Sequence, residues 1–184
     1  MDSLQGNFLI ATPQMPDPRF QKQVILLCSH SDKGAMGLII NRPAPYSICE
    51  ILRAARLSVN CEGEWPPIYS GGPVEPETAF FLYGMDYKNK NDYVSVSPGL
   101  NLSRDSGILV DIAHGRGPKK YLLLLGYAGW AAGQLEAELS RNGWLTVPGE
   151  NEILFDTPDE MKWQRSAAGY GIDISLYSDV AGSA

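Results

Sequence analysis

Two residues near the start of the chain, Cys28 and His30, are of types that can carry out chemistry. They follow an apolar run that predicts a strand, and alternate residues of a strand point to the same side. A neighbouring histidine can lower the pKa of a thiol and make it a nucleophile or a metal ligand. The alternative is a histidine at a strand end that is hydrogen-bonded to backbone. Because no third ligand is visible, we predict no metal site.

Two further segments carry groups that could hold an anion. Gly71 and Gly72 can adopt positive φ, so that successive backbone N–H groups converge on an anion or a carbonyl oxygen. The same pair could simply turn the chain. Asn41 and Arg42 follow a predicted strand, and the guanidinium of Arg42 could pair with a carboxylate or phosphate in planar fashion. A structural ion pair of Arg42 is an equally good interpretation.

The segment GYAGWAAGQL, residues 126–135, follows the apolar run at 121–125. Its three glycines surround Tyr127 and Trp130, and Gln134 begins a predicted helix. We interpret the segment as a loop in which the two aromatic rings stack on a planar ligand. The alternative is a tight corner in which the tryptophan covers the core.

The only basic cluster is HGRGPKK at 114–120. It could contact phosphates, although a solvated loop is the commoner meaning of such a run. The whole chain has a net charge of −6, and nucleic-acid binding depends on clustered Lys and Arg. We also find no helix-turn-helix pattern. Direct DNA binding through this loop is therefore the least favoured function.

The common catalytic motifs are missing, including G-x-S-x-G, the GxxxxGK[ST] phosphate loop, G-x-G-x-x-G after a strand and H-E-x-x-H. We therefore expect a non-catalytic binding or regulatory protein that takes a small ligand or a protein partner and uses no cofactor. The expected ligand-binding residues are His30, Asn41, Arg42, Gly71, Gly72, Tyr127, Trp130 and Gln134. The alternative is an enzyme with Cys28 as nucleophile, His30 as base and the 71–72 amides as oxyanion donors.

Length and composition predict one domain, residues 1–177, with a disordered tail at 178–184. The three cysteines, Cys28, Cys49 and Cys61, form no close pair, so we expect reduced thiols. The N-terminus lacks the basic and apolar regions of a signal peptide, and no apolar run is long enough to span a membrane. These features predict a cytoplasmic protein that is not inserted in a membrane.

The pattern of apolar residues predicts strands and helices without regular β-α-β alternation. A capping box at 47–50 begins a helix, the segments 24–28 and 36–40 form a hairpin, and 121–125 is a central strand. A further helix begins with Thr157 as N-cap. The other predicted strands are 8–11, 79–83, 93–96, 144–147 and 153–155, and the other predicted helices end at 113 and 142. These elements favour an α+β domain with a mixed, strongly curved sheet flanked by helices.

Four segments, in this order along most of the chain, resemble the bacterial YqgE/AlgH family. They are FLIATPQMPDPRFQKQVILLCSHSDKGAMGLIINRP (8–43), YSGGPVEP (69–76), LLLLGYAGWAAGQLEAELSRNGWLTVP (122–148) and LFDTPDEMKWQRSAAGYGID (154–173). The GAMG…NRP and GYAGW…GQLE…WL segments are the most specific.

This resemblance implies a cytoplasmic single-domain α+β protein with a branched, barrel-like sheet and no established catalytic activity. Some members of the family are labelled as transcriptional regulators, with a link to alginate synthesis. No catalytic residue can be transferred. The motif residues that can be transferred are His30, Gly34, Gly37, Asn41, Arg42, Pro43, Gly71, Gly72, Pro73, Gly126 to Trp130, Gln134 and Trp144.

Overall fold

The computed structural model describes residues 3–59, 61–62, 65–88 and 91–174. The predicted tail at 178–184 lies outside these residues. The strands are β1 (Asn7–Ala11), β2 (Val24–Ser31), β3 (Gly34–Ile39), β4 (Ile68–Ser70), β5 (Val74–Tyr83), β6 (Val94–Ser97), β7 (Leu100–Ser103), β8 (Tyr121–Ala131) and β9 (Trp144–Pro148). The helices are η1 (Pro18–Phe20), α1 (Ile48–Ala54), α2 (Gly107–Ala113), α3 (Gln134–Ser140), α4 (Asn151–Phe155) and α5 (Asp159–Ala168).

The strands form one mixed sheet in the order β6-β7-β5-β8-β3-β2-β1-β9, and β4 pairs with β8 beside this path. The β4–β8 pair is parallel, whereas every other pairing of these strands is antiparallel. The predicted hairpin is present, with Ser31 opposite Gly34 across a two-residue turn. The α+β class and the mixed sheet in a single domain are therefore confirmed.

The sheet curls strongly enough to bring strands from its two ends together. β6 lies at one end of the strand order, yet the Gln5 side chain just before β1 donates to the carbonyl oxygens of Ser95 and Val96, each at 3.1 Å. A Cβ on Gly6 would lie 3.2 Å from the Cβ of Ser97. The sheet therefore approaches a closed barrel, as expected.

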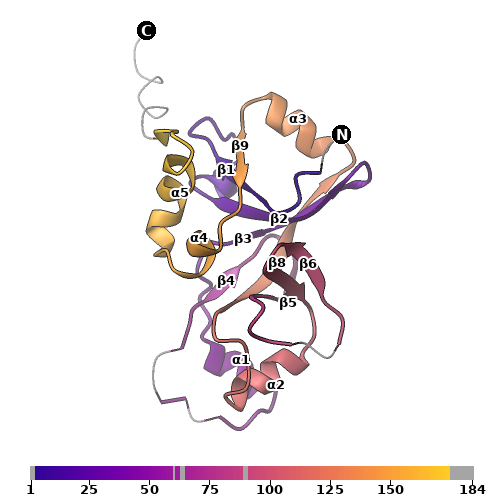
Figure 1. The fold of residues 1–184 in the computed structure, drawn as a ribbon, viewed down its shortest axis with the longest axis vertical. Helices are drawn as coiled ribbons and strands as arrows, with labels where there is room; N and C mark the ends of the chain where they lie inside the picture. Colours follow the sequence, from indigo (N-terminus) through magenta and orange to yellow (C-terminus); the bar gives the residue numbers. More distant parts are fainter. Residues whose placement is uncertain (1–2, 60, 63–64, 89–90, 175–184) are drawn as a thin grey trace.

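Strand β8 connects the two halves of the molecule (Figure 1). Its first half, through Leu125, lies between β4 and β5, whereas Ala128 to Ala131 pair with β3. Leu122, Leu123 and Leu124 are buried, as predicted for a central strand. Because one strand serves both parts of the sheet, the sheet branches at the middle of β8.

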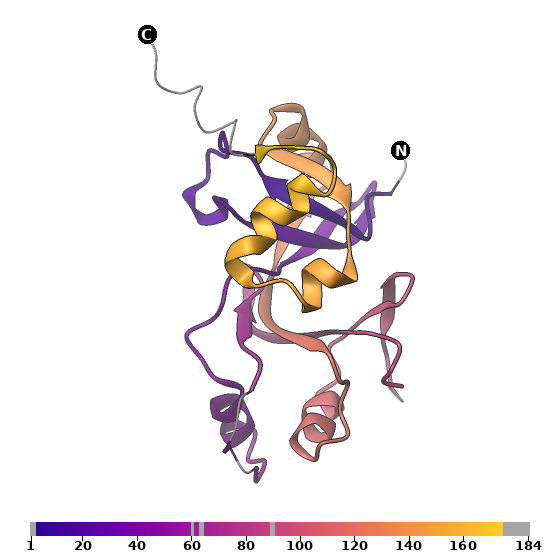
Figure 2. The same ribbon diagram turned by 60° about the vertical axis from the view of Figure 1, so that its left-hand side comes forward.

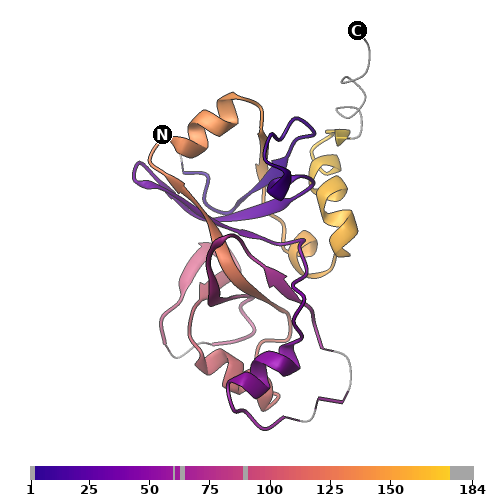
Figure 3. The ribbon, with the colours of Figure 1, turned by 180° about the vertical axis from the view of Figure 1, so that it is seen from behind.

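The helices cover three clusters of core side chains. Helices α1 and α2 lie together at one end of the molecule and share a cluster through Ile48, Leu52 and Ile112 (Figure 2). Helices α4 and α5 cover the outer side of the β1–β2 region (Figure 3), and α3 closes a separate cluster with Leu135. The two faces of the β2–β3 hairpin therefore meet different neighbours.

The start of α1 has the predicted capping box. The hydroxyl of Ser47 accepts from the N–H of Glu50 at 3.3 Å, and the Ser47 N–H donates to the Glu50 carboxylate at 2.6 Å. The predicted strand at 153–155 is wrong, because these residues belong to α4. Three apolar residues in a row fit a buried helical turn as well as a strand, so periodicity could not decide.

The last helix begins one residue later than predicted, with Pro158 rather than Thr157 at the N-cap position. The Thr157 hydroxyl instead donates to the carbonyl oxygen of Glu152 in the first turn of α4, 3.2 Å away. Thr157 therefore bonds to the preceding helix, α4, and does not cap α5.

The prediction of three reduced thiols is wrong. Cys49, in the first turn of α1, and Cys61 form a disulfide, with their Cα atoms 5.9 Å apart, and Cys28 is a free, buried cysteine. The odd count misled the prediction, because one cysteine belongs to the core and the other two lie twelve positions apart. The chain after α1 turns back on the helix, a contact that the spacing did not predict.

Candidate functional site

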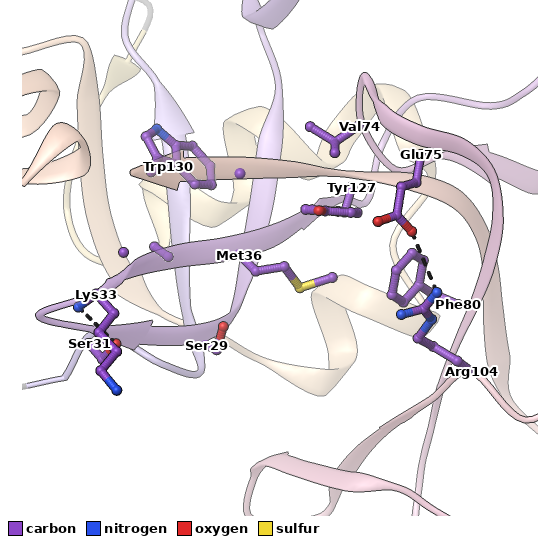
Figure 4. Close-up of a pocket in the computed structure, with 13 residues that line it drawn as sticks. Ser29, Ser31, Lys33, Met36, Val74, Glu75, Phe80, Arg104, Tyr127 and Trp130 are labelled. Carbon is purple, nitrogen blue, oxygen red and sulfur yellow. Dashed lines mark hydrogen bonds and ion pairs between the residues drawn. The ribbon is translucent and has the colours of Figure 1, made fainter. Parts of the chain in front are cut away.

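One open groove lies over the β2–β3–β8 part of the sheet, on the face opposite α3 (Figure 4). It has a volume of about 650 Å³ and is bordered by the start of β5 and by the residue that follows β7. Ser29, Met36, Gly129 and Tyr127 lie along it. On the other face of the same strands, Ala35 and Ala128 pack under Leu135 of α3, and Ala35 also borders the groove. The groove therefore lies on the open face of these three strands, and α3 covers their other face.

Each end of the groove carries a positively charged side chain (Figure 4). Lys33 occupies the β2–β3 turn, and its ammonium has no ion pair among the described residues. Arg104 lies at the other end, with Nη2 3.5 Å from the Glu75 carboxylate and its guanidinium 5.4 Å from the centroid of the Phe80 ring. Because Arg104 and Glu75 are largely exposed, water screens their ion pair and leaves Arg104 able to exchange partners.

The middle of the groove is apolar. Met36 packs against the core, and the Tyr127 ring meets Phe80 edge-to-face with their centroids 5.9 Å apart. Sequence reasoning selected Tyr127 but missed Lys33, Glu75 and Arg104. These three residues come from segments far apart in the chain, and no local motif marks any of them.

Trp130 belongs to the core and not to an exposed loop, because residues 126–131 continue β8. The residue is only 7% exposed. The indole N–H groups of Trp130 and Trp144 both donate to Oε2 of Glu138, each at 2.9 Å. Gln134 accepts from the Ala131 N–H and donates to Oε1 of Glu138. Glu138 therefore joins α3 to two strands, and Gln134 supports this network and does not line the groove.

The glycines of 71–72 and 126 allow two backbones to cross. The chain passes from β4 on one side of β8 to β5 on the other side. The Gly71 N–H donates to the carbonyl oxygen of Leu125 at 2.7 Å, so this amide already has a partner. A Cβ on Gly72 would overlap the backbone of Tyr127. The close crossing, and not an anion, accounts for these glycines.

His30 is held on both sides of its ring. Its Nδ1 accepts from the Leu4 N–H at 3.0 Å, so the neutral ring carries its proton on Nε2. Nε2 lies 2.9 Å from the Glu136 carboxylate. The hydrogen bond from His30 lowers the pKa of Glu136. The structure therefore matches the interpretation of His30 as a hydrogen-bonded histidine at the end of a strand.

Cys28 and His30 do not form a nucleophile–base pair. The β2–β3 register shifts between Leu27 and Ser29, so the two side chains lie on opposite faces of β2, and the prediction of a shared side is wrong. Cys28 packs in one core cluster, while Ala35, the partner of His30, packs in another. Burial raises the pKa of the Cys28 thiol. The enzyme alternative built on this pair fails on geometry.

Asn41 and Arg42 have different surroundings. Asn41 joins two segments, because its side chain accepts from the Val24 N–H at 3.0 Å and donates to the carbonyl oxygen of Lys22 at 2.9 Å. Arg42 is exposed, and among the described residues its guanidinium has no ion pair. Neither side chain lies in the groove.

The basic loop at 114–120 faces acidic neighbours. Arg116 pairs with Asp111, Lys120 pairs with Asp156, and the Lys119 N–H donates to Asp86. These carboxylates reduce the positive potential that phosphates would need.

Lys162 of α5 is a buried lysine, which the sequence pattern did not predict. Its Nζ lies 2.9 Å from the Asp159 carboxylate, donates to the carbonyl oxygen of Ile40 at 2.8 Å, and lies 4.9 Å from the centroid of the Tyr69 ring. The Tyr69 hydroxyl donates to the same Asp159 oxygen at 3.0 Å. The cluster fastens α5 to the sheet, away from the groove over β2, β3 and β8.

Together, the fold and the groove define a single-domain α+β protein with one curled, branched sheet and an open, charged-ended groove. In the part of the chain that the structure describes, no helix is both long and apolar enough to cross a membrane. The chain belongs to the AlgH-like family, whose profile matches residues 8–175.

Related proteins match over almost their whole length. A UPF0301 protein of Desulfotalea psychrophila is 42% identical over 184 residues, covering 100% of this chain and 96% of the relative. A UPF0301 protein of Ruegeria pomeroyi is 43% identical, covering 98% of this chain and 99% of the relative.

Two solved structures share the fold. The solution structure of the AlgH protein from Pseudomonas aeruginosa is 41% identical, with a TM-score of 0.78 over 99% of this chain and 96% of that one. A protein of Corynebacterium diphtheriae with 20% identity has a TM-score of 0.76 over 97% of this chain and 92% of that one. The second likeness concerns the fold alone.

Proposed function

We propose that this protein is a non-catalytic binding protein and that the groove over β2, β3 and β8 is its ligand site. The observation that carries the proposal is the arrangement in Figure 4, where Lys33 and Arg104 border the two ends and Met36 and Tyr127 form the apolar middle. A ligand with an apolar body and a negative group fits this arrangement. The separation of Cys28 from His30 supports binding over catalysis.

We also infer a regulatory role in the cytoplasm, exercised through a bound partner, and the exposed groove supports the binding part of this role. The net charge of −6 and the acidic partners of the 114–120 loop favour an indirect effect on gene expression over direct DNA contact. Of the eight ligand-binding residues expected from the sequence, Tyr127 and Trp130 border the groove. The other six lie outside it.

The test uses anilinonaphthalene sulfonate, a fluorescent probe that combines an apolar body with an anion. We expect saturable binding at low ionic strength, with shifts of the Met36 methyl signal. Lys33→Glu should raise the dissociation constant about fivefold, because reversing one exposed charge is worth about 1 kcal/mol. Lys119→Glu makes the same charge change outside the groove and should leave the constant unchanged. Equal effects of the two variants, or no shift at Met36, would remove the groove as the site.

A further inference from the structure

The edge of β8 that faces away from β3 is unpaired next to the groove. The hairpin register makes Ser31 and Gly34 a hydrogen-bonded pair, so Ala35 turns its N–H and C=O toward β8. Backbone groups alternate in direction along a strand. Trp130 therefore points its N–H and C=O toward β3, and Gly129 points its N–H and C=O away from β3, toward the unpaired edge. The Ala131 N–H confirms this alternation, because it points outward to the Gln134 side chain.

The neighbouring strand leaves this edge open. β5 begins at Val74, which lies opposite Tyr127, and among the described residues no strand continues past that point to pair with Gly129. Glu75 has a φ of +47° and a register shift follows Val74, so β5 bends away there. Helix α3 meets this edge at Ala131, whose N–H donates to the Gln134 side chain. Gly129 is exposed and lines the groove, so its N–H and C=O are accessible.

An N–H and a C=O on one exposed residue match the backbone of another extended chain. Such a segment would occupy the row that β5 would fill if it extended beyond Val74, and its alternate side chains would lie over Tyr127. Lys33, Arg104 and Glu75 border this space, and Glu75 pairs with Arg104. Lys33 is without an ion pair among the described residues, so the three side chains together carry one excess positive charge. These charges favour negatively charged side chains in the incoming segment.

We propose that the groove takes an extended, acidic polypeptide segment that adds to β8 through the backbone of Gly129. This inference rests on the proposed function, because it names the occupant of the same groove. The N–H of Gly129 and the two border cations define the occupant, an acidic chain in the β conformation.

The test uses a fluorescein-labelled, eight-residue peptide of alternating Glu and Val, with fluorescence anisotropy on the full chain. Gly129→Pro removes the docking N–H and no native strand bond, and it should weaken binding roughly fivefold. Gly129→Ala keeps that N–H, and its Cβ would meet side chains and no backbone, with the Tyr127 ring at 3.3 Å and Val74 Cγ2 at 4.0 Å. It should bind within about twofold of the wild type. A peptide with Lys in place of Glu should bind roughly fivefold more weakly.

Amide exchange in the wild-type protein gives a second measurement that does not depend on folding of the proline variant. Bound peptide should slow exchange at Gly129 about tenfold and leave Ala128 and Trp130 unchanged, because their N–H groups already face β3. Unchanged exchange at Gly129, or equal binding by a folded Gly129→Pro protein, would overturn the inference. If the sulfonate probe binds and the peptide does not, the inference of strand addition is wrong and the groove remains a ligand site. If neither binds, the groove fails as a site.

Discussion

The backbones of Gly72 and Gly126 touch where the chain crosses β8, and a Cβ on Gly126 would overlap the carbonyl oxygen of Gly72. Gly126 also has a φ of +72°, which costs an L-residue about 1–2 kcal/mol. We expect Gly126→Ala to lower the free energy of unfolding by about 3 kcal/mol or more, because the overlap adds to the strain. Urea denaturation measures this loss.

Gly115→Ala is the matched control for this prediction. Gly115 has a φ of +69°, and a Cβ there would meet nothing within 4 Å. The control should lose only the backbone strain, about 1–2 kcal/mol. Equal losses in the two variants would show that the crossing is not tight.

Glu138 should be the most important acidic side chain for the tertiary structure around α3. Glu138→Ala leaves the indole N–H groups of Trp130 and Trp144 without their acceptor, and we expect a loss of about 2–3 kcal/mol. Glu138→Gln keeps one acceptor oxygen and should lose about 1 kcal/mol. Denaturation followed by tryptophan fluorescence, with near-UV circular dichroism of the native variants, measures both. A glutamine variant as unstable as the alanine variant would contradict this account.

The contact between Glu136 and His30 predicts an acid-sensitive contribution to stability. Hydrogen bonding from His30 holds the pKa of Glu136 below its ordinary value of 4.5. The unfolded chain therefore binds the proton more readily, and the stabilisation is present above that value and lost as pH falls through the lower folded value. Glu136→Gln cannot titrate, so its stability should fall less steeply between about pH 5 and 3. Denaturation across this range tests the slope, and a slope equal to that of the wild type would contradict the prediction.

Two lysine–aspartate pairs in this protein should contribute different amounts to the free energy of unfolding, because one is buried and the other is exposed. Lys162→Met removes a buried ammonium from Asp159 and from the carbonyl oxygen of Ile40, and we expect a loss of about 3 kcal/mol. Lys120→Met breaks an exposed pair with Asp156 and should lose under about 0.5 kcal/mol. Thermal and urea unfolding of both variants measure the difference. Similar losses would show that α5 is held by its other contacts.

The Cys49–Cys61 disulfide should contribute about 2–3 kcal/mol, because it closes a short loop in the unfolded chain. Cys61→Ser should lower the melting temperature, and reduction of the wild type should lower it equally. A thiol assay of the unfolded chain should find one thiol before reduction and three afterwards. More than one thiol before reduction would show that the bond is absent.

The fold was largely predictable, because its signals are local. The capping box at Ser47, the hairpin around Lys33 and the apolar run of β8 each depend on neighbouring residues. The errors came where distant chain segments meet. The glycines of 126–133 indicated a loop, although Gly126 marks a crossing with Gly72, which lies 54 positions earlier. A single sequence contains no signal for that contact.

The candidate site was predicted less well than the fold. Tyr127 was selected for its aromatic ring in a glycine-rich segment, and it does line the groove. His30 was selected for its chemistry, but a register shift of one residue in β2 separates it from Cys28. Lys33 and Arg104 carried no motif, and only the curl of the sheet brings them to the same groove. The residue types showed that Cys28 and His30 could react. The strand register, which a single sequence does not show, determined that these two side chains lie apart.

The position of β8 in the chain has a consequence for synthesis. All three of its partners, β3, β4 and β5, precede it, and β5 ends at Tyr83, well before β8 begins at Tyr121. On the ribosome, β3 and β5 therefore emerge before the strand that lies between them, and they wait several seconds at about 5–20 residues per second. During that interval their edges are open to other chains. A nascent chain stalled before Tyr121 therefore exposes the edges of an unfinished sheet, and translation of β8 supplies the strand that pairs with both β3 and β5.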